Sequence, residues 1–361
     1  MTARRKSNAV RVGRLTVGGN APISVQSMTN TDPRDRRATL SQVRALASAG
    51  CDVIRLAVPD KGAAGIFSYL KESGIEVPLV ADIHFDYKIA LEAVAAGADK
   101  IRINPGNVGS RDNVAAVVRA CRSAGVPIRI GVNGGSLERP LLAKYGAPTP
   151  EAIAESALGH AAILESLDFY DTVISVKSSD VGTMIEANRI LAEKTAYPLH
   201  LGVTEAGGLK RGTVKGAIGI GTLLSEGIGD TVRVSLTADP VEEVAAAREI
   251  LSALGLDPTA GIDVISCPTC GRTKIDLIPL LAEFEKGLDE RGLRNKKLKV
   301  AFMGCAVNGP GEAREADLGI AGGDGEALLF RHGETVAKYP QDKIVGILLD
   351  EIETTDPDVR G

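Results

Sequence analysis

The chain has 361 residues, of which 44% are hydrophobic and 24% are charged. This composition is typical of a folded globular protein, and the length suffices for a large domain followed by a smaller one. The formal net charge of -4 and the aromatic content of only 3% argue against a basic nucleic-acid surface and against a set of aromatic rings that stack on bases. We therefore expect no nucleic-acid partner.

Membrane insertion and disulfide bonding are also disfavoured. No apolar run approaches the roughly 20 residues that a membrane-spanning helix needs, and the basic segment 1–19 lacks the apolar core of a signal peptide. We expect a cytoplasmic protein with no membrane partner. Five cysteines are an odd number, and three of them lie in the last third of the chain. This distribution favours metal or redox chemistry over a disulfide scaffold.

Short runs rich in β-branched residues alternate with segments rich in Ala, Leu and Glu, which is the rhythm of repeated βα units. The predicted strands lie at residues 23–28, 52–58, 78–84, 100–104, 127–133, 172–178, 198–204 and 231–237. The predicted helices include residues 37–48, 87–96, 111–124, 151–165, 182–193 and 240–253. Eight such units predict a TIM (β/α)8 barrel. The alternative is an open doubly wound sheet, but the Gly219-Ile220-Gly221 stretch follows no clear strand and lacks the rest of a dinucleotide-binding motif.

The pattern changes after Gly255, so we expect the barrel to cover residues 1–255. A short linker with Pro and Gly follows at 256–261, and a small α/β domain is expected over 262–361. Its predicted elements are a helix near 275–290, runs at 298–303 and 316–320, a strand at 327–331 and a helix at 341–351. At the other end of the chain, apolar residues alternate around Gly13-Arg14. They predict a hairpin that covers the floor of the barrel.

Five of the predicted strands carry a cation between aliphatic or small residues: Arg55, Arg102, Arg129, Lys177 and Arg233. Side chains alternate between the two faces of a strand, so the aliphatic residues are expected to face the helices and the cations the barrel interior. The residues two positions away on the cation side are mostly small or polar, and they supply few carboxylates. Buried cations without carboxylates need an anionic ligand, and a diphosphate suits guanidinium groups. The small or polar neighbours are Ala57, Asn104, Gly131, Ser175, Ser179 and Ser235.

Polar residues also stand at the C-terminal ends of the predicted strands, where TIM barrels build their active sites. They are Asp82, His84, Asn133 and Glu205, which suit acid, base or hydroxyl-binding roles. A structural interpretation remains open for two of them. His84 alone would be typical of a hydrogen-bonded packing residue, and Glu205 has Lys210 and Arg211 as nearby ion-pair partners.

Three cysteines lie in the predicted second domain. Cys267 and Cys270 form a C-x-x-C motif, which fits a zinc site, a redox pair or half of an iron-sulfur site. Cys305 lies in a Gly-rich turn that runs to Glu312 and includes Asn308. A zinc site would need a fourth strong ligand, and His332 is the one histidine of this domain. An iron-sulfur cluster whose fourth ligand is Glu312 or the substrate is the sharper alternative. We expect the two remaining cysteines, Cys51 and Cys121, to be buried apolar residues.

These motifs resemble the 4-hydroxy-3-methylbut-2-en-1-yl diphosphate synthases of the non-mevalonate isoprenoid pathway. The resemblance covers essentially the whole chain in the two-domain bacterial form. The most specific matches are the segments 267–272 and 305–312. The other matching segments are 25–31, 81–85, 102–107 and 129–133.

The resemblance implies a 4Fe-4S cluster and a reductive reaction. It implies that the cluster receives electrons from flavodoxin or ferredoxin and that the enzyme opens the ring of 2-C-methyl-D-erythritol 2,4-cyclodiphosphate with loss of water. Glu205 and His84 are candidates for proton transfer, and Asn308 and Asn133 for positioning a hydroxyl group. The implied cluster ligands are Cys267, Cys270, Cys305 and Glu312. The implied diphosphate ligands are Arg55, Arg102, Arg129, Lys177, Arg233 and Ser235.

Two other classes of protein remain as alternatives. One is a phosphate-binding TIM-barrel aldolase or isomerase that carries a zinc-stabilised oligomerisation domain, and it needs no redox chemistry. The other is a redox-sensing regulator, which would require a nucleic-acid surface that this acidic chain does not offer.

We further expect a homodimer whose active site is shared between chains. The predicted last strand of the barrel runs toward the catalytic face, so the helix at 240–253 must return the chain to the opposite face. The linker of six residues at 256–261 spans at most roughly 20 Å, too little to bring the cysteine domain to the mouth of its own barrel. A two-fold dimer resolves this, because each cysteine domain then covers the barrel of its partner.

Overall fold

The computed structural model describes residues 2–84, 86–104, 108–305 and 315–355 of the chain. It divides into two compact units, Met1–Asp257 and Pro258–Gly361. The division lies within the linker expected at residues 256–261. Each unit has its own hydrophobic core. Among the described residues, no helix combines the length and the apolar character that crossing a bilayer requires.

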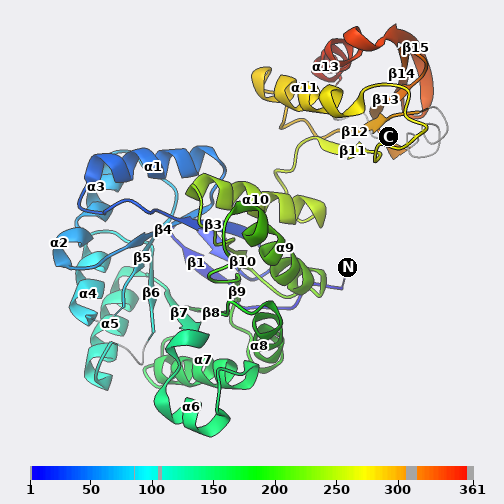
Figure 1. Ribbon diagram of the computed structural model, residues 1–361. Coiled ribbons are helices and arrows are strands. Elements are labelled where there is room, and N and C mark those ends of the chain that lie inside the picture. Colours follow the sequence, from blue (N-terminus) through cyan, green and yellow to red (C-terminus); the bar gives the residue numbers. More distant parts are fainter. Residues whose placement is uncertain (1, 85, 105–107, 306–314, 356–361) are drawn as a thin grey trace. The chain divides into compact units, whose positions relative to one another are not determined.

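The first unit contains the expected barrel of eight parallel strands (Figure 1). The strands follow one another around the barrel in chain order from β3 to β8, and β10 pairs with both β3 and β9. An isolated parallel bridge joins Ile174 of β8 to Leu199, the residue before β9, so the ring closes there. The strands are β3 (Ser24–Met28), β4 (Val53–Ala57), β5 (Leu79–Asp82), β6 (Lys100–Ile103), β7 (Ile128–Asn133), β8 (Thr172–Lys177), β9 (His200–Leu201) and β10 (Thr231–Val232).

Strands β9 and β10 are much shorter than predicted. The sequence predicts strands over 198–204 and 231–237, but regular pairing ends after two residues in each. The next residue of β9 is Gly202, where a side chain would collide with the Arg233 carbonyl oxygen at 2.6 Å. The backbone segments that follow β9 and β10 run very close together here, and regular strand geometry stops at this point.

Helices surround the barrel, and their ends follow local capping chemistry. The Ser110 side chain accepts a hydrogen bond from the Asn113 amide at the start of α5, and Gly125 ends that helix in the left-handed conformation. Asp239 caps α10, where Pro240 occupies the first turn. The helices are α1 (Arg36–Ser48), α2 (Lys61–Ala64), α3 (Ile66–Glu72), α4 (Tyr87–Ala95), α5 (Arg111–Ala124), α6 (Arg139–Tyr145), α7 (Pro150–Glu165), α8 (Val181–Lys194), α9 (Leu209–Ser225) and α10 (Pro240–Ala253), with a short 3-10 turn at Gly134–Ser136.

Helix α9 was not predicted, and it contains the Gly219-Ile220-Gly221 stretch. That stretch therefore lies inside a helix and is not a dinucleotide-binding loop.

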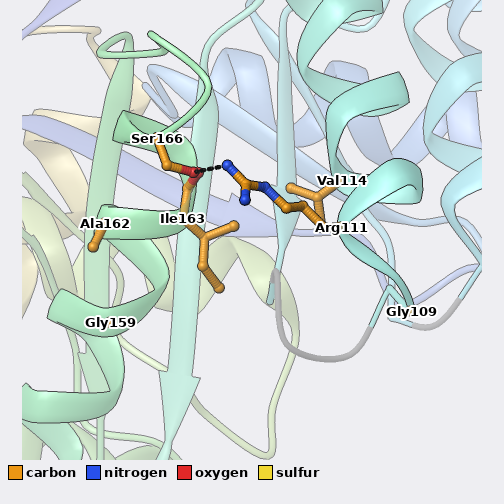
Figure 2. A pocket seen from close by; sticks show the side chains of 7 residues that line it. All are labelled: Gly109, Arg111, Val114, Gly159, Ala162, Ile163 and Ser166. Carbon is orange, nitrogen blue, oxygen red and sulfur yellow. Dashed lines mark hydrogen bonds between the residues drawn. The ribbon is translucent and has the colours of Figure 1, made fainter.

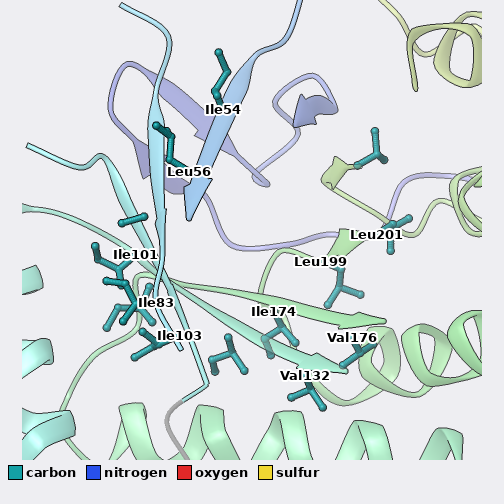
Figure 3. Close-up of a cluster of buried hydrophobic side chains, with 14 of the residues drawn as sticks. Ile54, Leu56, Ile83, Ile101, Ile103, Val132, Ile174, Val176, Leu199 and Leu201 are labelled. Carbon is teal, nitrogen blue, oxygen red and sulfur yellow. The ribbon is translucent and has the colours of Figure 1, made fainter. Parts of the chain in front are cut away.

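The main core lies between the strands and the surrounding helices, and it is built from the aliphatic residues that alternate with the polar ones (Figure 3). Ile54, Leu56, Ile101, Ile103 and Val132 are all fully buried on this side.

The N-terminal hairpin covers the end of the barrel where the strands begin, as the sequence predicts. It consists of β1 (Val10–Val12) and β2 (Leu15–Val17), which pair antiparallel. Its residues Val10, Val12 and Val17 form a small buried cluster with Val173. Val173 lies near the start of β8, so this cluster closes the N-terminal end of the barrel.

The second unit is a five-stranded mixed sheet with two helices packed on it (Figure 1). The strands β11, β12 and β13 run parallel, and β13, β14 and β15 run antiparallel. Strands β11 and β15 were not predicted. The elements are β11 (Asp263–Ser266), α11 (Leu277–Glu290), β12 (Lys299–Met303), β13 (Leu318–Gly322), β14 (Glu326–Arg331), β15 (Glu334–Pro340), a 3-10 turn at Gln341–Lys343 and α13 (Ile344–Thr354).

Candidate functional site

The strand register places the predicted cations on one face. Arg102 pairs with both Asp82 and Arg129 in the parallel ladders, and directly paired residues point to the same side of a sheet. Asn133 pairs with Lys177 in the same way. Since the aliphatic residues between them face the helices, these side chains occupy the barrel interior. Their relative exposure is only 8% for Arg102, 1% for Arg129 and 7% for Lys177.

Asp82 is the centre of an ion-pair network. Its carboxylate lies 3.1 Å from Nη1 of Arg102, 3.8 Å from Nε of Arg55 and 3.6 Å from Nε2 of His84. Burial disfavours the charged carboxylate, but the charge of Arg55, the hydrogen bond with His84 and the charge of Arg102 outweigh it and hold the pKa of Asp82 well below its ordinary value. Asp82 therefore carries a negative charge, and His84 lies beside it.

A second interior carboxylate, Glu243, was missed by sequence reasoning. It belongs to α10, and its two oxygens each lie 3.1 Å from a guanidinium nitrogen of Arg233. Ser27 Oγ donates a hydrogen bond of 2.8 Å to the same carboxylate, and the Leu236 amide donates another of 3.0 Å. The expectation of few interior carboxylates is thus wrong for Arg233, whose charge is met within the chain. No sequence signal separates Glu243 from its exposed neighbour Glu242.

Arg129, Lys177 and Arg55 remain poorly compensated. Nε and Nη1 of Arg129 are buried with no hydrogen-bond partner among the described residues. Burial and then the charge of Arg233 hold the pKa of Lys177 well below its ordinary value. The guanidinium of Arg55 donates to the sulfur of Met28 at 3.0 and 2.9 Å, which is a weak acceptor, and burial lowers the pKa of Arg55 to about 10.

Two glycines make room for these cations. A side chain at Gly131 would lie 2.3 Å from Nε of Arg102, and one at Gly202 would lie 3.0 Å from Nζ of Lys177. Gly131 was among the small residues expected beside the cations, whereas Gly202 was not. The interior is therefore shaped around the cationic groups, and it offers an anion donors, such as Nε and Nη1 of Arg129, to which no described residue forms a hydrogen bond.

The remaining predicted residues of the barrel lie around the C-terminal ends of the strands. Asn104 is buried directly after β6, and Asn133 ends β7. Ser235 is half-buried beyond β10, and Glu205 is exposed beyond β9. The backbone of Glu205 is left-handed, with a φ of 52°. This conformation is uncommon for a residue with a side chain and is often found at functional sites.

In the second unit, two neighbouring strands bring the predicted cysteines to the same sheet edge. Strands β11 and β12 run parallel with Ser266 paired to Phe302, so both end at one edge. Cys267 follows β11 directly, and Cys305 is the second residue after β12. The Gly304 amide donates a 3.1 Å hydrogen bond to Sγ of Cys267, which ties the two loops together. The three cysteines at this edge are free thiols.

The chemistry of this donor set fits an iron-sulfur cluster. Cys270 is exposed, and the backbone hydrogen bond from Arg272 is the main cause that lowers its pKa, which favours the thiolate that metals require. A backbone amide that donates to a cysteine sulfur, as Gly304 does, is a recurring feature around cluster thiolates. Asn308 and Glu312 lie outside the described residues. Among the residues that are described, no three His, Cys, Asp or Glu side chains are grouped closely enough to hold a metal ion.

The other two cysteines are buried, as the sequence predicts. Cys51 has a relative exposure of 3% and Cys121 of 0%.

A separate pocket of about 400 Å³ lies outside the barrel interior, between α5 and α7 (Figure 2). Arg111 reaches across it to Ser166 at 3.3 Å, and Val114 and Ile163 line it. None of its lining residues belongs to the predicted site.

The chain matches known proteins over nearly its full length. It is 58% identical over 351 residues to the 4-hydroxy-3-methylbut-2-en-1-yl diphosphate synthase (flavodoxin) of Clostridium perfringens, covering 97% of this chain and 99% of that one. It is 55% identical over 360 residues to the protein of the same name from Symbiobacterium thermophilum, covering 100% and 96%.

Solved structures support the barrel alone. A type I 3-dehydroquinate dehydratase from Clostridium difficile covers 69% of this chain and 98% of its own, with 14% identity and a TM-score of 0.52. This identity is too low to carry more than the fold.

Two family models account for the two units. The GcpE TIM-barrel domain matches residues 7–248, and the GcpE protein C-terminal domain matches residues 263–354. With the barrel, the interior cations and the thiols at one sheet edge, the chain therefore belongs to the GcpE family.

Proposed function

We propose that this protein catalyses the reductive ring opening of 2-C-methyl-D-erythritol 2,4-cyclodiphosphate to 4-hydroxy-3-methylbut-2-enyl diphosphate. The observation that carries this proposal is the group of buried interior cations with unused donors, above all Arg129. The names of the full-length relatives supply the product. An anion with several charged oxygens is what such an interior can bind.

The barrel cations bind the diphosphate. Arg129 offers two buried donors that no described residue meets, Lys177 lies near it in the interior, and Arg55 and Arg102 share the single Asp82. Arg233 is held by Glu243 and presents its remaining donor to the ligand together with the Ser235 hydroxyl. These groups neutralise the charge that develops on the phosphate oxygen when the ring opens.

Residues at the strand ends position the sugar part of the substrate and move protons. Asn104 and Asn133 bind hydroxyl groups, and Asn308 contributes from the second unit. His84 is oriented by Asp82 and is exposed enough to reach a ligand, so it can exchange a proton with it. Glu205 is the second group proposed for proton transfer.

Cys267, Cys270, Cys305 and Glu312 hold a 4Fe-4S cluster. When bound, the cluster supplies electrons one at a time to the substrate. Reduced flavodoxin is the proposed donor, since it appears in the names of the relatives. Ferredoxin is the alternative donor.

We also propose that the working form is a homodimer with composite sites. The substrate must meet both the cations of a barrel and the thiolates of a cysteine domain, and the linker between the two is short. A site built from the barrel of one chain and the cysteine domain of its partner satisfies both requirements.

The metal content tests this function against its nearest rival. Protein purified without oxygen is expected to be brown and to contain iron and acid-labile sulfide in equal amounts, with both reduced in Cys270→Ser. A colourless protein with stoichiometric zinc would instead support a zinc-stabilised, phosphate-binding aldolase or isomerase. Glu312→Gln is expected to retain the fold and to lose cluster or turnover.

A further inference from the structure

A second polar layer lies one step deeper in the barrel than the predicted cations. Lys100 lies two residues before Arg102 on β6, and Gln26 lies two residues before Met28 on β3, so both point inward. His200 pairs with Thr231, which in turn pairs with Ser24. Each of the five side chains in this deep layer is at most 2% exposed. The deep layer consists of Ser24, Gln26, Lys100, His200 and Thr231.

The polar atoms of the deep layer lack partners within the described chain. Nζ of Lys100, both ring nitrogens of His200 and both amide atoms of Gln26 are enclosed and form no hydrogen bond to other described residues. The hydroxyl oxygens of Ser24 and Thr231 are also enclosed and form no hydrogen bond to other described residues. One buried polar atom without a partner is costly, so a whole layer of them indicates a function other than stabilising the fold.

The charges around Lys100 are predominantly positive. Arg129 and Arg55 are the charges that act on it most strongly, and Asp82 and Glu243 already pair with arginines. At the foot of the barrel, Asp99 pairs with Lys71 and Asp230 pairs with Arg4. The charged and titratable groups of the interior are Arg55, Asp82, Lys100, Arg102, Arg129, Lys177, His200, Arg233 and Glu243.

This setting favours the neutral amine in the protein without ligand. Burial, followed by the charges of Arg129 and Arg55, lowers the pKa of Lys100 well below its ordinary value. Burial, followed by the charges of Arg129 and Lys177, lowers the pKa of His200 well below its ordinary value. An anion that enters one layer above, roughly 7 Å away along β6, opposes these effects and favours the protonated amine.

The proposed reaction increases the negative charge of such an anion. A carbon–oxygen bond of the ring breaks, and its electron pair stays on the phosphate oxygen. Two electrons from flavodoxin and one proton are taken up, and one water leaves. The cyclic substrate, with both phosphates as diesters, carries two negative charges, and the linear product carries three when fully ionised.

We propose that Lys100 is a proton acceptor beneath the diphosphate site, and that it binds a proton from solvent when the cyclic diphosphate enters the barrel. This inference rests on the proposed function and extends it to a positioning residue that acts through the charge of the site. The proton on Lys100 compensates the negative charge of the substrate when the substrate binds. It remains in place as the ring opens and the negative charge of the diphosphate grows. It returns to solvent when the product leaves.

Calorimetry of the holoenzyme with oxidised cluster and no reductant tests this inference. Titration with 2-C-methyl-D-erythritol 2,4-cyclodiphosphate in buffers of different ionisation enthalpy measures the protons taken up, since the diester phosphates do not titrate near neutral pH. Wild-type protein is expected to take up protons, and its affinity falls with rising pH, by up to about tenfold per pH unit where one proton is bound.

Two substitutions and a control assign the proton uptake to Lys100. Lys100→Met is expected to bind more weakly and to take up fewer protons than wild type, and Lys100→Arg, which is always charged, to bind tightly while also taking up fewer protons. Lys71→Met, which removes a lysine paired with Asp99 outside the interior, keeps the wild-type uptake. Tight binding with no proton uptake in wild type, or full uptake in Lys100→Met and Lys100→Arg, would overturn the inference and leave the proposed function intact. No binding of the substrate at all would overturn both.

Discussion

The most informative single residue is Arg129, because its buried charge is useful only when an anion is present. In the ligand-free protein an uncompensated buried cation is destabilising. We expect Arg129→Met to raise the melting temperature while weakening binding of the cyclic diphosphate about 10- to 100-fold, since a hydrogen bond to a charged group contributes about 1.5–3 kcal/mol. Calorimetry and thermal unfolding measure the two effects.

The matched control for Arg129 is Arg14→Met. Arg14 is an exposed arginine on the hairpin that pairs with Glu76, so its removal changes the net charge equally and should alter neither quantity appreciably. Unchanged affinity in Arg129→Met would show that the diphosphate binds elsewhere.

The five cysteines are expected to differ sharply in reactivity. Burial raises the pKa of Cys51 and Cys121 to about 12, so these thiols stay protonated at pH 8. Cys270 is exposed, and its pKa is lowered. In cluster-free folded protein, iodoacetamide at pH 8 should therefore alkylate Cys270 and leave Cys51 and Cys121 intact, as mass spectrometry can measure.

Unfolded protein, in which all five thiols react, is the control for that measurement. Alkylation of Cys51 at the rate of Cys270 in folded protein would contradict the burial that the barrel core gives it.

At the scale of elements, helix α9 shows how glycines serve packing. A Cβ at Gly219 would lie 2.5 Å from Cε of Met184 and 2.8 Å from Val203, whereas Gly221 has no neighbour within 4 Å. Gly221→Ala should raise the free energy of unfolding by about 0.5–1 kcal/mol because alanine favours a helix. Gly219→Ala should lower it by about 1–3 kcal/mol through overpacking.

Urea denaturation measures both variants. Because the two positions lie on one helix, helix propensity is the same for both, and equal effects of the same sign would refute the close packing of α9 against the barrel.

Much of the barrel is predictable because its elements carry strong local signals. Helices α5 and α10 begin and end where their caps predict, and strand alternation places Arg102 and Arg129 inside. Long-range packing explains what was not predictable. Strand β9 stops where Gly202 approaches the neighbouring backbone, and Glu243 turns inward to Arg233 from a helix with several acidic residues. Neither feature leaves a pattern in the sequence.

The deep layer was also not predicted, for a related reason. Lys100 and His200 stand at the starts of their strands, where a polar residue is equally compatible with an exposed loop. Only the closure of the barrel and the hairpin beneath it bury them. The cysteine motifs, in contrast, are recognisable without the fold, because their spacing is itself the signal.

At the scale of the whole molecule, the proposed composite site predicts complementation between chains. Cys270→Ser removes a proposed cluster ligand, and Arg129→Glu removes a proposed diphosphate ligand, so each variant alone should be inactive. A heterodimer of the two contains one site that combines the intact barrel with the intact cysteine domain. Co-expression should therefore restore part of the activity, and demonstrated heterodimers without activity would reject the shared site.

We propose that the interior cations and the three thiols serve one reductive ring opening. A turnover assay measures this reaction itself: it combines anaerobic protein with its cluster, reduced flavodoxin and 2-C-methyl-D-erythritol 2,4-cyclodiphosphate, and mass spectrometry identifies the product. We predict formation of 4-hydroxy-3-methylbut-2-enyl diphosphate by wild type, strongly reduced in both Arg129→Met and Cys270→Ser. A cluster-loaded protein that accepts electrons and binds the substrate but forms no linear diphosphate would show that the cations and thiols do not serve this reaction.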